Sequence, residues 1–139
     1  MASKVKTAGV ERVHAPTYFR KAVQFCEAAA EAYAHERYDA ALVLSIHAGI
    51  GSSDAVSIGL GTRRSTDSHE RAADLLEEVG SYSREFTESA KHLRLLLAQK
   101  NAIEYENKRA TRKDAELGIR RCEHLVGWTR NILAAARLL

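Results

Sequence analysis

Hydrophobic side chains recur at steps of three and four residues along most of this chain, which is the spacing of one face of an α-helix. In the first segment of this kind, residues 16–35, the apolar positions include Phe19, Ala22, Val23 and Cys26. The same pattern predicts further helices over about residues 67–79, 81–105 and 111–139, and a nearly uncharged apolar stretch predicts one over about residues 39–58. No segment shows the strict alternation that is typical of a half-buried β-strand.

These patterns predict an all-α fold, an up-and-down bundle of four to five helices. The bundle is expected to be a single domain over residues 16–139, because a chain of 139 residues suits one domain. Residues 1–15 are polar and irregular, so we expect them to form a flexible N-terminal arm.

The second predicted helix, residues 39–58, is apolar on nearly every face, which indicates a central helix covered by the others. Gly49 and Gly51 weaken its helical propensity. Two glycines so close together indicate the tight approach of another helix, from this chain or from a second subunit. Gly59-Leu60-Gly61 is expected to end the helix, since glycine accepts a left-handed backbone.

Composition adds few constraints on function. Hydrophobic residues make up 45% of the chain and charged residues 28%, and the formal net charge is only +3, which permits an anionic partner without requiring one. Cys26 and Cys122 fall at buried helical positions and are expected to be reduced thiols. Without a CxxC or Cys/His cluster, no metal or other cofactor is predicted. No apolar run suggests a membrane span or a secretion signal, so we expect a cytoplasmic protein.

The candidate chemistry lies between residues 39 and 69. His47 and Asp54 interrupt the most apolar helix, and burying either of them is costly without a partner. Arg64 and His69 follow, with four residues between them, where a new helix should begin. Arg63 has a similar spacing to His69 and is the alternative cation.

Three stretches of the sequence resemble the HEPN domain family. Residues 18–56 are similar to its opening pair of helices, and residues 100–128 to its late turn and last helix. The segment from Arg64 to His69 resembles its Arg-x(4–6)-His nuclease motif. In the best-known nucleases of the family that motif lies near the end of the domain, whereas here it falls between the second and third helices, as in an actinobacterial-type subgroup.

The resemblance implies a metal-independent endoribonuclease of toxin or defence type, with RNA as the substrate. Arg64 would then contact a phosphate, His69 would move protons, and Asp54 would orient one of them, with His47 and Arg63 in support. It further implies a homodimer whose two Arg-x4-His segments share one groove, and a possible antitoxin or nucleotidyltransferase partner. The alternative is a non-catalytic HEPN module that binds a partner protein, a nucleotide or RNA; in that case Arg64 and His69 are a solvated loop pair and His47 is a core or interface histidine.

Overall fold

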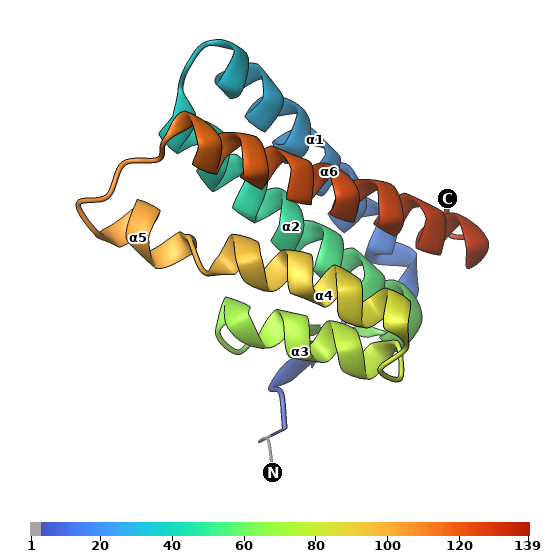
Figure 1. The fold of residues 1–139 in the computed structure, drawn as a ribbon. Coiled ribbons are helices and arrows are strands. Elements are labelled where there is room, and N and C mark those ends of the chain that lie inside the picture. Colours follow the sequence, from blue (N-terminus) through green and yellow to red (C-terminus); the bar gives the residue numbers. More distant parts are fainter. Residues whose placement is uncertain (1–3) are drawn as a thin grey trace.

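Five long helices and one short helix form the body of the structure, a computed structural model that describes residues 4–139 (Figure 1). The helices are α1 (Ala15–Ala34), α2 (Tyr38–Gly61), α3 (His69–Val79), α4 (Arg84–Leu97), α5 (Lys100–Tyr105) and α6 (Arg112–Ala135). The predicted all-α helical bundle is confirmed.

Helix α2 lies at the centre of the bundle, with α1 and α6 on one side of it and α3 and α4 on the other (Figure 1). By length and composition it is the one helix within residues 4–139 that could span a membrane, contrary to the sequence prediction of none. Its most apolar window is 72% buried in the bundle, however, and a core helix covered on every side needs that composition.

Gly49 and Gly51 of α2 are explained by neighbours in the same chain. A Cβ atom at Gly49 would lie 2.7 Å from Leu96 Cδ1 of α4, and one at Gly51 would lie 3.2 Å from Ala22 Cβ of α1. The predicted close approach of another helix is therefore confirmed. Because α1 and α4 already supply the contacts, the glycines give no support to a second subunit.

Several helix boundaries differ from the prediction; α6, for example, ends at Ala135 although it was expected to continue to residue 139. Helix α2 continues through Gly59 and Gly61, and Thr62 takes the left-handed conformation (φ 53°) in their place. The predicted helix over residues 81–105 is two helices, α4 and α5, separated at Ala98 and Gln99. At the start of α6 the capping box between Thr111 and Asp114 is present as expected.

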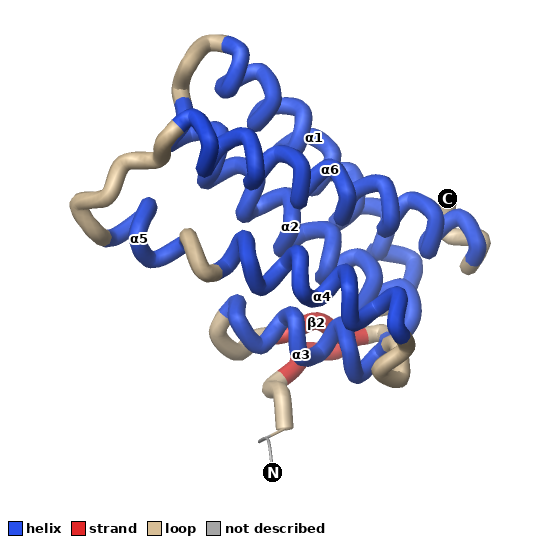
Figure 2. Tube along the Cα trace, viewed as in Figure 1, coloured by secondary structure: helices blue, strands red, loops and turns tan. Residues whose placement is uncertain are grey.

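The N-terminal segment is partly regular, contrary to the prediction of a flexible arm without strands. Strand β1 (Thr7–Gly9) pairs antiparallel with β2 (Arg63–Ser65), and a 3-10 helix, η1 (Arg12–His14), leads into α1. Figure 2 shows the strands beside α3. Each strand has only three residues, too few for a periodic pattern to appear in the sequence. Residues 1–3 of the predicted arm lie outside the described residues.

Cys26 of α1 and Cys122 of α6 are free and buried, as expected for core thiols. Their Sγ atoms are 3.1 Å apart, so the two side chains form part of the contact between these helices.

Replacement by alanine should change stability in opposite directions at Gly80 and at Gly127. A Cβ atom at Gly80 would lie 2.0 Å from Phe86 Cγ, the fixed root of a buried ring, whereas a Cβ atom at Gly127 in α6 would meet nothing within 4 Å. We expect Gly80→Ala to lower the free energy of unfolding by about 2 kcal/mol through overpacking. Gly127→Ala should raise it by about 0.5–1 kcal/mol through helix propensity.

Urea unfolding followed by circular dichroism measures both changes. A Gly80→Ala protein as stable as the wild type would contradict the close packing of Phe86 on the end of α3.

Candidate functional site

Strand β2 brings the predicted site residues together by folding back along α2. Asp54 lies seven residues before Gly61, the last residue of α2, a distance of about 10 Å along a helix. An extended chain covers the same distance in about three residues. Arg64 therefore returns to the level of Asp54, and α3 begins at His69 beside the middle of α2.

A pocket of about 170 Å³ lies at this place. It is lined by Asp54, Arg64, Ser65, Thr66, Asp67, His69 and Ala72. The three residues predicted as the centre of the site, Asp54, Arg64 and His69, thus share one small cavity, although they come from α2, β2 and α3.

Burial dominates the electrostatics of Asp54. It raises the pKa of the carboxyl to about 7, and the positive charge of Arg64 opposes this shift without overcoming it. Within residues 4–139 no hydrogen bond or ion pair holds the carboxylate. Near neutral pH Asp54 is therefore divided between its protonated and charged forms.

His69, the first residue of α3, has the opposite shift. Partial burial lowers the pKa of its imidazole, and the charges of Lys100 and His47 lower it further, while Glu104 opposes them. His69 is consequently neutral at pH 7, the form that accepts a proton.

A second pocket, of about 320 Å³, lies on the other side of His69. It is lined by Ser68, His69, Glu70, Leu97, Lys100, Asn101 and Tyr105. Helix α5 supplies its far wall and lies near the start of α3 (Figure 1).

An ion-pair chain connects this second pocket to α2. Lys100 Nζ is 2.7 Å from Glu104 Oε2, and His47 Nε2 is 3.5 Å from Glu104 Oε1. His47 also lies against Phe25, with the ring centroids 5.9 Å apart. His47 does not line the Asp54 pocket; it lies beside Glu104, and its side chain is 42% exposed.

Arg63 lies away from both pockets. Successive side chains of a strand point to opposite faces, so Arg63 and Arg64 diverge. Arg63 Nη2 is 3.5 Å from Glu78 Oε1 on α3, and this pairing assigns Arg63 a structural position.

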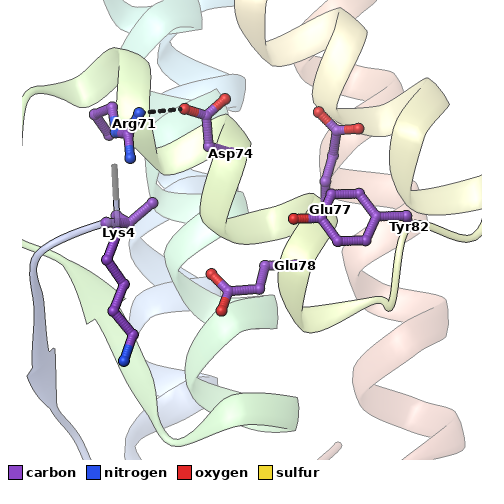
Figure 3. Close-up of a pocket in the computed structure, with 7 residues that line it drawn as sticks. Lys4, Arg71, Asp74, Glu77, Glu78 and Tyr82 are labelled. Carbon is purple, nitrogen blue, oxygen red and sulfur yellow. Dashed lines mark ion pairs between the residues drawn. The ribbon is translucent and has the colours of Figure 1, made fainter. Parts of the chain in front are cut away.

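A third pocket, of about 340 Å³, has Asp74, Glu77 and Glu78 in its lining (Figure 3). All three carboxylates are held in ion pairs. Asp74 pairs with Arg71 at 3.1 Å and with Arg94 at 2.8 Å, Glu77 also pairs with Arg94, and Glu78 pairs with Arg63. This network ties α3 to α4 and β2, so we interpret it as structural.

Sequence reasoning did not include Asp67 or Glu104 in the site, and it interpreted Lys100 and Tyr105, which resemble HEPN family positions, as the amphipathic rim of a helix. Lys100 and Glu104 are four residues apart, a spacing that occurs on many exposed helices and therefore does not indicate a site. Only the tertiary structure, in which α5 packs against α2, brings Lys100 and Glu104 close to His69. Among residues 4–139, no group of three side chains able to ligate a metal ion comes together.

Comparison with protein-family models and with curated proteins gives no match to this chain.

The pKa of Asp54 predicts a pH dependence of stability. Because the folded pKa of about 7 lies above the ordinary 3.8, the folded state binds this proton more tightly than the unfolded state. The contribution of Asp54 is fully present below about pH 4 and is lost as the pH rises to about 7. Asp54→Asn cannot ionise, so it should be more stable than the wild type by about 1–3 kcal/mol at pH 8, and no more stable near pH 4.

Urea denaturation at pH 4.5, 6 and 8 measures this difference. Asp67→Asn is the control of opposite sign, because the Ser68 N–H lowers the pKa of Asp67 and the charged form is favoured on folding. Loss of stability in Asp54→Asn at pH 8 would mean that Asp54 acts as a structural partner of Arg64.

Proposed function

We propose that this protein is a HEPN-like, metal-independent endoribonuclease whose site is formed by Arg64, His69 and Asp54. The observation that carries the proposal is the single pocket lined by a guanidinium, an imidazole and a carboxyl group. The HEPN resemblance of the sequence supports the same reaction class.

Each of the three groups suits one part of RNA cleavage. Neutral His69 accepts the proton of the 2′-hydroxyl, whose oxygen attacks the adjacent phosphorus. Arg64 pairs with the non-bridging phosphate oxygens as negative charge develops on them. Protonated Asp54 donates to the departing 5′-oxygen, and the products are a 2′,3′-cyclic phosphate and a 5′-hydroxyl.

The different pKa shifts of the two titrating groups support this division of roles. Asp54 has a pKa of about 7, and the pKa of His69 is below its ordinary value. A protonated acid and a neutral base therefore coexist just below neutral pH, as catalysis by an acid–base pair requires.

A homodimer is part of this proposal only because the HEPN resemblance implies one. Gly49 and Gly51 do not support it, because helices of the same chain already pack against them. In such a dimer the Asp54 pockets of the two subunits would line one shared groove, in which the RNA would bind. An antitoxin or nucleotidyltransferase partner and a cytoplasmic location are proposed on the same ground.

Removal of either Arg64 or His69 should abolish most cleavage. In the presence of EDTA, we expect wild-type protein to cleave single-stranded RNA, and Arg64→Ala and His69→Ala to lower kcat/KM by about 10²–10⁴-fold. Arg63→Ala is the matched control, because this neighbouring arginine pairs with Glu78 away from the pocket. It should stay within a few-fold of wild type.

Gel analysis of end-labelled RNA, with identification of the cyclic phosphate, measures this. An equal loss in Arg63→Ala would remove the special role of Arg64. Binding of RNA without cleavage by wild-type protein would instead favour the non-catalytic module, which the modest net charge of +3 also permits.

The pH–rate profile should be bell-shaped. The acidic limb should lie below pH 6.5, because protonated His69 cannot act as the base, and the alkaline limb near pH 7, where Asp54 loses its proton. In Asp54→Asn the alkaline limb should disappear while the acidic limb stays. An unchanged alkaline limb in that variant would assign the acid to another group.

A further inference from the structure

His69 forms a wall of two pockets, and the second has a different chemical character from the first. The Asp54 pocket contains Arg64, which suits a phosphate. The second pocket contains the phenol ring of Tyr105, the amide of Asn101 and the apolar side chain of Leu97. Two pockets that share one side chain suit neighbouring parts of one extended ligand.

Tyr105 is placed to receive a flat group. It is 74% exposed, although large aromatic residues are usually covered, and it stands at the end of α5. Lys100 Nζ lies 5.2 Å from the centre of the ring and helps to hold its position. Nucleic-acid bases stack on aromatic rings of this kind, with little dependence on sequence.

The charges of the second pocket favour an uncharged group over a second phosphate. Lys100 is the cation in its lining, and Glu104 already neutralises it through a 2.7 Å ion pair in which both side chains are largely buried. Glu70 adds a negative charge to the same wall. A neutral base meets no penalty here, and the Asn101 amide can both donate to its edge and accept from it.

We infer that the pocket of Tyr105, Asn101 and His69 binds the base of a nucleotide next to the scissile phosphate, so that the substrate is single-stranded RNA with that base stacked on Tyr105. This inference rests on the proposed function of the Asp54 pocket. Within it, Tyr105 is a positioning residue that holds the chain so that the phosphate reaches Arg64. A base in a duplex is already stacked, which is why the strand must be unpaired here.

Binding of an RNA that cannot be cleaved tests the inference without catalysis. A fluorescein-labelled hexanucleotide with 2′-O-methyl groups lacks the attacking hydroxyl, and fluorescence anisotropy gives its Kd. We expect Tyr105→Ala to raise the Kd by about tenfold, and Tyr105→Phe, which keeps the ring, to stay within about threefold of wild type. Tyr82→Ala is the matched control, because Tyr82 is 68% exposed at the opposite end of α3.

Abasic substitution then identifies the stacked base. Removing the base that contacts Tyr105 should weaken wild-type binding as much as Tyr105→Ala does, and the two changes together should not add. Abasic positions elsewhere in the oligonucleotide should add to the effect of Tyr105→Ala.

The outcomes separate this inference from the proposed function. Cleavage by the wild type with an unchanged Kd in Tyr105→Ala overturns the inference and leaves the nuclease in place. Absence of cleavage with a Tyr105-dependent Kd supports the base pocket and overturns the nuclease. If wild-type protein does not bind the oligonucleotide, or if Tyr82→Ala weakens binding as much as Tyr105→Ala, the inference is wrong.

Discussion

The apolar character of α2 constrains the rest of the structure, because a helix without a polar face must be covered on every side. Helices α1, α6, α3 and α4 provide most of that cover. Close to His47 and Asp54, two titratable residues in the body of the helix, shorter pieces add to the cover: β2, the start of α3, and α5. Both pockets around His69 lie among these short elements, in the same region as His47 and Asp54.

Opposite environments act on the carboxyl groups around His69. Asp54 is desolvated and lacks an ion pair within residues 4–139, so burial raises its pKa to about 7 despite Arg64. Glu104 is also largely buried, but the hydrogen bond from Lys100 lowers its pKa and keeps it charged. One carboxyl is thus able to exchange a proton near neutral pH and the other is not. In the proposed mechanism this difference suits Asp54 to proton transfer, whereas Glu104 holds Lys100 and His47 in place.

Periodicity predicted most of the helices, since α1, α3 and α6 each bury a regular set of apolar positions. The apolar character of α2 on nearly every face predicted its central place instead, and local chemistry predicted the Thr111–Asp114 capping box. The gathering of Asp54, Arg64 and His69 in one pocket was also predictable, because a desolvated carboxyl favours nearby cations and the nearest ones follow in sequence, although no ion pair holds Asp54 within residues 4–139. The β1–β2 pair was not, as three residues per strand carry no pattern. The partners of Gly49 were equally hidden: spacing shows that something approaches closely, and only the tertiary structure shows that it is Leu96.

The N-terminal strand completes the site from outside the bundle. Ala8 lies opposite Arg64 in the antiparallel register, and the pairing is extended on both sides by hydrogen bonds, from Val10 N–H to the Thr62 carbonyl at 3.0 Å and from Thr66 N–H to the Lys6 carbonyl at 2.9 Å. A lone strand with unpaired backbone groups would hold its side chains loosely, whereas a charge-stabilising group is effective when its position is fixed before the reaction. Since α2 fixes Asp54 and α3 fixes His69, Arg64 is the member of the three that depends on β1. The segment that composition alone predicts to be a loose arm is therefore a structural support of the pocket.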